Sequence, residues 1–294
     1  MTSHRRIARV VTVPPLSPGF AGPGHLAAQV LSAADFAQND PFIMLADDHL
    51  DMGERPVGGP HPHAGFETVT LILDGAIHDR DEGGVIGAGE VQWMTAGSGI
   101  VHGEDVTTRG PVRLLQLWLT LPKADRWTPP AFQDIHATDV PVRREPGAAV
   151  RVYSGVSGPA RSATQNHVPV TITETTLAAH ASVTHDLPAS YNGFVFVLDG
   201  AVSVGEENDT TLLLTGQVGW LGRGGGGDDP SLVRTVAGAD GARFVLYAGE
   251  PQHDPIVSHG PFIGDSRQDI ARLYAEYRAG QFPRLSELKE STLP

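Results

Sequence analysis

Two stretches of this chain are similar to one another in sequence and in spacing. Each begins with an apolar segment that ends in Asp-Gly, at residues 69–75 in the first copy and 194–200 in the second. Each continues, after nearly the same interval, to a Gly-x-Val-x-Trp motif at residues 89–93 and 216–220. Apolar segments that stop at Asp-Gly are typical of β-strands that enter a tight hairpin turn. The repeat therefore predicts two similar β domains in tandem.

The composition supports this interpretation. The 294 residues include 35 Gly and 23 Pro, a content that favours short strands joined by turns over long helices. Alternating strand and helix units are not visible, so a doubly wound sheet is not expected. We expect an all-β protein with two tandem antiparallel β-barrels, one in a domain over residues 1–135 and one in a domain over residues 136–294.

One helix is expected near the C-terminal end. Ser266 is a suitable N-cap, and Asp269 three residues later is an imperfect capping-box partner. Gly280 fits the C-terminal stop. The apolar face at helical spacing consists of Ile270, Leu273, Tyr274 and Tyr277. We expect this helix to pack on a sheet.

The first copy carries two pairs of metal-competent side chains. His61 and His63 are two residues apart, and so are His102 and Glu104 about forty residues later. Residues i and i+2 of a strand point to the same side of the sheet. If the two strands face each other, three imidazoles and one carboxylate converge. This set suits a divalent ion with open positions, with Fe(II), Mn(II), Cu(II), Ni(II) and Zn(II) as candidates.

The second copy lacks this set of ligands. Aligned at Asp-Gly, it places Asp186 and Pro188 at the positions of the first two histidines. Aligned at Gly-x-Val-x-Trp, it places Asp229 and Ser231 at the positions of the second pair. Proline cannot bind a metal through its side chain. One metal site per chain, in the first copy, is therefore the expectation.

Other polar residues near the motifs have ordinary explanations. Glu67 lies an even offset from His63, so it could be a ligand, a partner of an imidazole or a structural acceptor, and we expect a role other than ligation. Solvated positions are expected for His78, Asp79 and Asp81. Ordinary roles are expected for His49, His180 and His185, which have no partner at ligand spacing. Support of the barrel is expected from Phe66, Trp93, Met94 and Trp118.

Several function classes are excluded by composition. The chain has no cysteine, which rules out disulfides and thiolate chemistry. The net charge is −13, and the cluster of Arg5, Arg6 and Arg9 is too short for a nucleic-acid footprint, so we interpret it as a solvated terminal segment. The tract of residues 222–227 lacks the Lys-Ser/Thr ending of a phosphate loop. No signal peptide or membrane span is visible, so a soluble, cytoplasmic protein is expected.

Several motifs resemble those of the pirins, a family of the cupin superfamily. The resemblance covers about residues 40–283. It is carried by Asp40-Pro41-Phe42, by residues 61–69 (HPHAGFETV), by residues 92–102 (QWMTAGSGIVH), and by residues 116–118, 128–130, 259–262 and 277–280. Ala64 stands where the family commonly has Arg, and Gly103 where it has an acidic or small residue. Ala64 removes a charge expected at the mouth of the site.

The resemblance implies a bicupin whose N-terminal barrel holds one metal ion, usually iron. The family's ligands fall on His61, His63, His102 and Glu104. Several members resemble quercetin 2,3-dioxygenases, and others are described as regulators that act through protein partners. The resemblance thus implies a ring-opening dioxygenase acting on a flavonol or related enolic aromatic and dioxygen, with Glu104 as the base that takes the substrate's hydroxyl proton. The alternative is a non-catalytic metal- or redox-sensing protein. We expect a monomer.

Overall fold

The computed structural model describes residues 3–53, 55–57, 59–79, 84–103, 106–108, 110–223, 229–284 and 287–288. Contacts group the chain into two units. The C-terminal unit comprises residues 1–13 and 140–251, and the N-terminal unit comprises residues 14–139 and 252–294. Each unit is therefore discontinuous, which differs from the linear division expected at residues 135 and 136. In the described part of the chain, no helix is long and apolar enough to cross a membrane.

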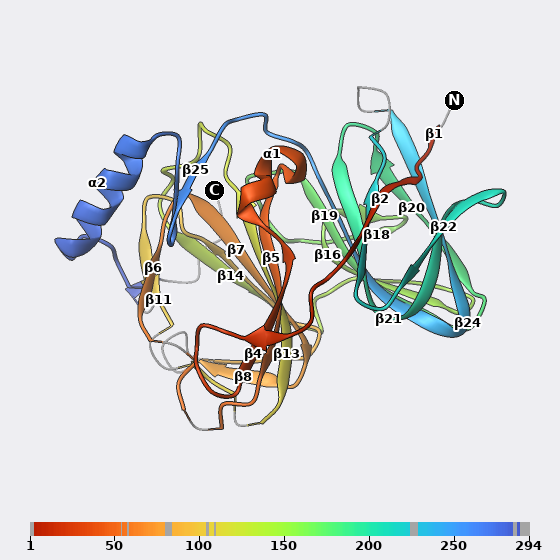
Figure 1. Cartoon of the computed structure of the whole chain (residues 1–294), viewed down its shortest axis with the longest axis horizontal. Helices are drawn as coiled ribbons and strands as arrows, with labels where there is room; N and C mark the ends of the chain where they lie inside the picture. Colours follow the sequence, from red (N-terminus) through yellow and green to blue (C-terminus); the bar gives the residue numbers. More distant parts are fainter. Residues whose placement is uncertain are drawn as a thin grey trace. The chain divides into compact units, whose positions relative to one another are not determined.

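The C-terminal unit is built on a sheet of ten strands (Figure 1). Its main path runs β15-β16-β19-β24-β21-β23-β2, with β1 and β20 paired to β24 and β22 paired to β21. The strands are β1 (Ser3–His4), β2 (Ile7–Thr12), β15 (Val142–Glu145), β16 (Ala148–Ser154), β19 (Val170–Leu177), β20 (Ser182–Pro188), β21 (Asn192–Glu206), β22 (Asp209–Leu214), β23 (Gln217–Leu221) and β24 (Pro230–Gly249), and β17 (Val156–Ser157) pairs separately with β18 (Ala160–Arg161). All pairings are antiparallel except that of β1 with β24.

An apolar core lies on one face of this sheet. Buried side chains from β16, β19, β20, β21, β22, β23 and β24 all belong to one cluster, which includes Val152, Val197 and Phe244. Because strands from β16 through β23 along the path contribute to the same core, the sheet curves around it as a barrel does. Alternate residues of each strand supply this core, as the period of two requires.

The N-terminal arginine segment is only partly solvated, which corrects the expectation from sequence for Arg5. Arg5 is only 3% exposed, and its guanidinium donates hydrogen bonds to the carbonyls of Gly222 and Tyr191 at 2.8 and 2.9 Å. The strand that follows, β2, pairs with β23 over Ile7–Thr12. Arg6 and Arg9 are exposed. The segment thus belongs to the sheet because β23 offers it a free edge.

The N-terminal unit contains a seven-stranded antiparallel sheet in the order β14-β10-β7-β13-β5-β4-β3. Its strands are β3 (Ser17–Pro18), β4 (His25–Leu31), β5 (Phe42–Leu50), β7 (Phe66–Asp74), β10 (Val91–Thr95), β13 (Val112–Thr120) and β14 (Ala131–Ile135). Small sheets join β6 (His61–His63) with β11 (Ile100–His102), and β8 (Ala76–Asp79) with β9 (Gly84–Gly87) and β12 (Val106–Thr107). Two short helical turns, η1 (Ala33–Asp35) and α1 (Phe36–Asn39), precede β5.

The repeat is present in both units, but its Asp-Gly steps are not hairpin turns. Gly75 and Gly200 have φ of +79° and +74°, and a Cβ at either would lie 2.4 and 2.3 Å from the carbonyl oxygens of Pro111 and Gly241. After Gly75 the chain enters β8, which pairs with β9 and β12, whereas β21 continues past Gly200 with register shifts. The expectation of a hairpin was wrong. Each glycine instead adopts a positive φ at a bend in the strand, where another backbone segment passes too closely for a side chain.

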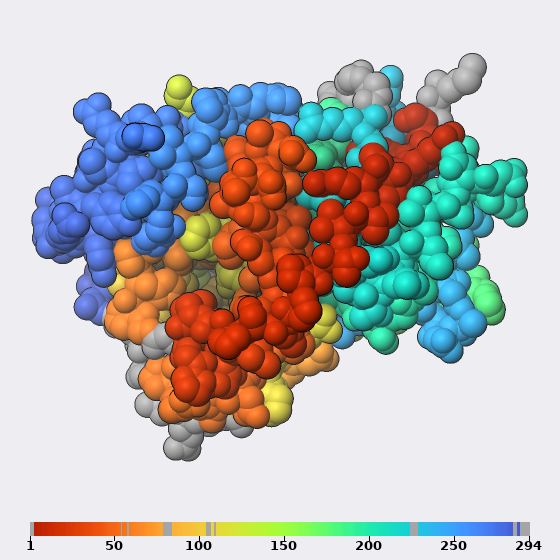
Figure 2. Space-filling model, viewed as in Figure 1, coloured from red at the N-terminus to blue at the C-terminus, as the bar shows by residue number. Residues whose placement is uncertain are grey.

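The C-terminal segment returns to the N-terminal unit as β25 (Val257–His259), β26 (Phe262–Gly264) and α2 (Arg267–Arg278). The predicted helix is confirmed, since the Ser266 hydroxyl accepts a hydrogen bond from the backbone N–H of Asp269 and Gly280 has φ +68°. Ile270 and Leu273 are buried against Ala64 and neighbouring apolar residues. In Figure 2 the blue C-terminal segment lies next to the orange segment that contains β6.

Candidate metal centre

Two very short strands bring the predicted histidines together. β6 and β11 pair antiparallel, with His102 opposite His61 and Ile100 opposite His63. Because alternate residues share a face, His61 and His63 project on the same side as His102 across the pair. The predicted convergence of these three imidazoles is therefore present.

The three imidazole rings are close enough to share one ion. Ring centroids lie 4.4 Å apart for His61 and His102, 4.9 Å for His61 and His63, and 5.0 Å for His63 and His102. One nitrogen from each ring lies within 4.8 Å of the other two. Metal–imidazole bonds are about 2.0–2.1 Å long, so the nitrogens are within a small side-chain movement of a common coordination sphere.

Electrostatics keep two of the rings in the neutral form that binds metals. Burial and, to a smaller extent, the neighbouring His61 lower the pKa of His63 to about 3, against the opposing effect of the Pro261 carbonyl. Burial, followed by the neighbouring His63 and His61, holds the pKa of His102 well below its usual value of 6.5. Neutral imidazoles present a lone pair to an ion without first losing a proton.

The hydrogen bonds of the rings also fit a metal. The Nδ1 of His61 lies 2.8 Å from the carbonyl oxygen of Gly59, which can only accept, so this nitrogen carries the proton and Nε2 keeps its lone pair. Within the described part of the chain, the buried Nδ1 of His63 has no hydrogen-bond partner. A buried imidazole nitrogen without a partner is costly unless something fills that place. The residues present therefore suit a divalent transition metal.

The fourth predicted ligand, Glu104, lies outside the described residues. The preceding residue, Gly103, has φ +83°, and a Cβ there would lie 3.0 Å from the Cε1 of His61. Because Gly103 has no side chain, the ring of His61 has room beside it. Ala64, which stands where the family commonly has Arg, is fully buried against Phe262 and α2, so its position faces the core and not the mouth of a site.

Aromatic side chains wall one side of the histidines. Phe66 and Trp118 meet the ring of His63 edge-on, with centroids at 5.3 and 5.4 Å, and lie 4.3 Å from each other. Phe66, Trp93 and Met94 are buried, as expected from the sequence. Trp118 was expected only as a core residue, and its contact with His63 was missed because β13 and β6 are far apart in the sequence.

Glu67 is not part of the group of three histidines. It lies on β7, it is fully buried, and its Oε1 accepts a 2.7 Å hydrogen bond from the hydroxyl of Thr95. Burial raises the pKa of this carboxyl to about 7, against the Thr95 hydrogen bond, which lowers it. Glu67 thus holds its proton more tightly than an ordinary glutamate and supports the sheet behind the site.

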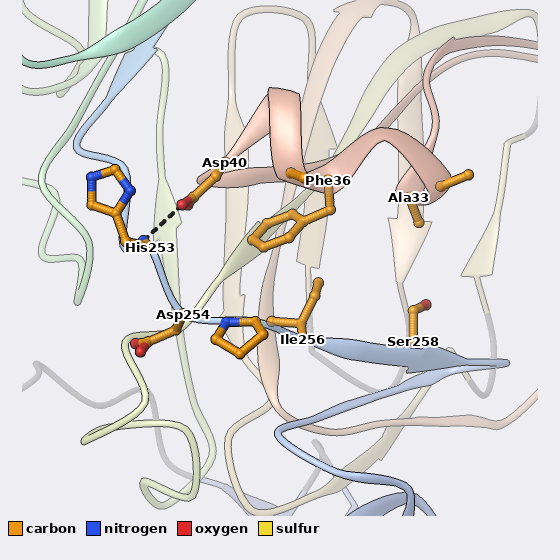
Figure 3. Close-up of a pocket in the computed structure, with 10 residues that line it drawn as sticks. Ala33, Phe36, Asp40, His253, Asp254, Ile256 and Ser258 are labelled. Carbon is orange, nitrogen blue, oxygen red and sulfur yellow. Dashed lines mark hydrogen bonds between the residues drawn. The ribbon is translucent and has the colours of Figure 1, made fainter.

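A pocket of the N-terminal unit lies apart from the three histidines of the cluster. A cavity of about 770 Å³ lies between the η1–α1 turns and residues 253–258, and Figure 3 shows Phe36 and Ile256 on its apolar side. Both carboxylate oxygens of Asp40 accept backbone hydrogen bonds, from Gln252 and His253 at 3.0 and 2.8 Å. Asp40 therefore fixes the rim of the cavity. Three converging imidazoles indicate a functional site more specifically than the size of a cavity does.

The C-terminal unit presents no comparable cluster within the described residues. Asp186 and Pro188 lie on β20, and the hydroxyl of Ser231 donates to the Leu187 carbonyl at 2.9 Å. His185 on the same strand is 2% exposed, and its ring meets that of Phe244 edge-on with the centroids 6.3 Å apart. Burial lowers the pKa of His185 to about 3, and Arg143 adds to the effect.

Comparison with known proteins adds independent evidence on the family. The model of the Pirin family matches residues 25–119, and that of the Pirin C-terminal cupin domain matches residues 172–283. A Pseudomonas aeruginosa protein provisionally named a quercetin 2,3-dioxygenase is 33% identical over 280 residues, which cover 90% of this chain and 94% of that protein.

Solved structures share the architecture. A crystal structure of quercetin 2,3-dioxygenase from Acinetobacter baumannii has a TM-score of 0.81 and 28% identity, and the match covers 95% of this chain and 99% of the other. A bacterial pirin from Escherichia coli, crystallised with nickel(II), has a TM-score of 0.59 and 17% identity, with 83% of this chain and 99% of the other covered. The second similarity shows the fold alone.

Proposed function

The chain belongs to the pirin family, and we propose that it is an iron-dependent dioxygenase that opens the ring of a flavonol or a related enolic aromatic. The observation that carries this proposal is the convergence of three imidazoles on one face of β6 and β11, two of them held neutral. Similarity to proteins named quercetin 2,3-dioxygenases supports the choice of substrate class.

Nitrogen ligands without sulfur are compatible with Fe(II), and also with Mn(II), Cu(II), Ni(II) and Zn(II). A bound Fe(II) would supply Lewis-acid and redox chemistry, with positions left open for substrate. His61, His63 and His102 would hold it, with Glu104 as the proposed fourth ligand. The bacterial pirin from E. coli was itself crystallised in complex with nickel(II).

The side chains around the histidines would bind and orient the substrate. We place Glu104 as the base that takes the proton from the substrate's 3-hydroxyl, because it follows His102 by two residues. Phe66 and Trp118 would exclude water from the side of His63 that they cover. An apolar, dry wall strengthens the electrostatic effect of any charge beside it.

The test is dioxygen uptake with quercetin by protein loaded with Fe(II) under anaerobic conditions. The proposal expects uptake that depends on both iron and flavonol, and the Glu104→Gln variant should keep its iron but lose about 100-fold or more in turnover. Iron binding without any flavonol-dependent uptake would contradict the substrate assignment. That result would favour a metal-sensing protein that acts through protein partners. Unchanged turnover in Glu104→Gln would contradict the base role.

A further inference from the structure

The strands that carry the histidines are too short to hold their own position. β6 and β11 contain three residues each, and they form a two-stranded sheet separate from the main one. A two-stranded ribbon is marginally stable in water even at greater length. The geometry of the three imidazoles must therefore depend on what packs against these strands.

Both strands are held from outside by the C-terminal strap, defined as residues 257–284. Ala64, directly after His63, forms a parallel bridge with Phe262, and the N–H of Ile263 donates to the Ala64 carbonyl at 3.0 Å. On the other strand, the N–H of Val101 donates to the Pro283 carbonyl at 2.9 Å. The strap thus binds the residues next to His63 and His102 although it lies far away in the sequence.

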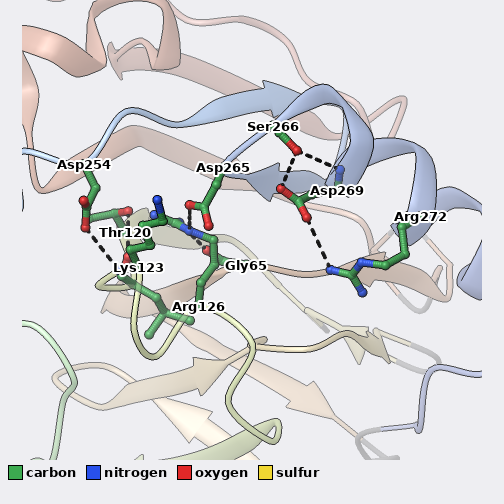
Figure 4. Close-up of polar contacts among 10 residues, drawn as sticks. Gly65, Thr120, Lys123, Arg126, Asp254, Asp265, Ser266, Asp269 and Arg272 are labelled. Carbon is green, nitrogen blue, oxygen red and sulfur yellow. Dashed lines mark hydrogen bonds and ion pairs between the residues drawn. The ribbon is translucent and has the colours of Figure 1, made fainter.

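The buried side chain of Arg126 joins this strap to the backbone that directly follows β6. The side chain of Arg126 is completely buried, its Nε donates to the Oδ1 of Asp265 at 2.7 Å, and its Nη1 donates to the carbonyl of Gly65 at 3.1 Å. Figure 4 shows the guanidinium between these two acceptors. Asp265 belongs to the strap, and Gly65 is two residues from His63. The planar guanidinium presents its Nε and Nη1 donors to the two acceptors in a rigid fork, whereas an ammonium is a point charge on a flexible stem.

The contact leaves little freedom at Gly65. Its φ is +86°, and a Cβ there would lie 2.0 Å from the carbonyl oxygen of Ile263, so the strap passes directly over it. The N–H of Gly65 donates to the Gly97 carbonyl at 2.8 Å. A second contact joins the same regions, since the guanidinium of Arg272 lies 4.5 Å from the ring centroid of Trp127.

We propose that Arg126 and Asp265 are positioning residues of the metal centre. By joining the strap to the carbonyl of Gly65, they fix the backbone that presents His63 to the ion. This inference rests on the proposed metal centre. We call the contacts of Arg126 with Asp265 and with the Gly65 carbonyl the latch. The strap that supplies Asp265 matches the family's C-terminal cupin model through residue 283. Outer contacts of this kind typically change metal affinity by about 10–100-fold when removed.

The test titrates full-length apo protein with Co(II) and follows both the dissociation constant and the visible ligand-field spectrum, alongside the thermal midpoint of the apo form. Arg126→Met should weaken Co(II) binding about 10–100-fold and change the spectrum. Asp265→Asn keeps an oxygen acceptor and should lose less Co(II) affinity than Arg126→Met. Arg126→Lys keeps the charge and should fold, yet lose affinity because it lacks the rigid fork that fixes both acceptors.

A matched ion pair in the same unit provides the control. Arg113 contacts both oxygens of the buried Asp47 at 3.0 and 2.8 Å, away from β6 and β11 on strands β13 and β5. Arg113→Met should lower the thermal midpoint while Co(II) affinity and spectrum stay unchanged. If Arg126→Met does not fold, Arg126→Lys decides the question. Wild-type affinity and spectrum in the Arg126 variants would overturn the latch, whereas wild-type protein that binds no Co(II) would overturn the metal centre itself.

Discussion

His61 and His102 lie directly opposite each other on the antiparallel pair β6–β11, with ring centroids 4.4 Å apart. Directly opposed residues of adjacent strands share a face, so this register alone brings the two motifs of the sequence together. A slip of one residue would turn one ring to the other side. The register is therefore what makes a three-histidine site out of two separate pairs.

The close approach of the strap over Gly65 gives a stability prediction. Gly65→Ala should lower the free energy of unfolding by about 2–5 kcal/mol, because the new methyl group meets the Ile263 carbonyl and the backbone is left-handed. Gly22 has nearly the same φ, +87°, but nothing lies within 4 Å of its missing Cβ. Gly22→Ala should therefore cost only about 1 kcal/mol in urea unfolding. Equal losses in the two variants would contradict the proposed crowding.

The buried His185 predicts a loss of stability in acid. Its pKa is lowered from 6.5 to about 3, mainly by burial, so between these values the unfolded chain binds a proton that the folded chain does not. The free energy of unfolding should fall as pH falls from about 6.5 towards 3, by up to about 1.4 kcal/mol per pH unit from this group. The variant His185→Leu should show a correspondingly shallower decline. Parallel pH curves for the two proteins would contradict the assignment.

Glu67 predicts a pH effect of the opposite sign. Its pKa is raised from 4.5 to about 7 by burial, so the folded chain binds more protons than the unfolded one in this window. The stability from this group is complete below pH 4.5 and is lost as pH rises through about 7. Relative to Glu67→Gln, wild-type protein should become less stable from about pH 4.5 to 7, as measured by chemical unfolding. A difference between the two proteins that does not change with pH would rule this out.

The sequence predicted the fold through its repeat, for a reason visible in the structure. Gly89 donates to the carbonyl of Ile72 at 2.8 Å, and Gly216 donates to the carbonyl of Val197 at 2.9 Å, so corresponding glycines close the same turn in both units. The assignment of residues 1–13 to the C-terminal unit and of residues 252–294 to the N-terminal unit was not predictable in this way. It depends on pairing of β2 with β23, which are far apart in sequence, and local patterns carry no record of such partners.

The three histidines were predictable because strand periodicity places His61 and His63 on one face, and a second motif about forty residues later supplies His102. The latch was not, because Arg126 and Asp265 are separated by 139 residues and β25 and β26 are too short to show an alternating pattern. Asp265 next to the predicted N-cap Ser266 gave no signal of its own. Glu104 remains a prediction, since it lies outside the described residues.

The most direct test of the metal centre is the transition-metal content of the purified protein after loading with Fe(II) and removal of the excess. We predict one ion per chain in wild-type protein, and loss of that ion in His63→Ala and His102→Ala. His253→Ala, an exposed histidine outside the cluster, should retain it. Wild-type protein without bound metal, or a His102→Ala variant that keeps a full ion per chain, would contradict the account.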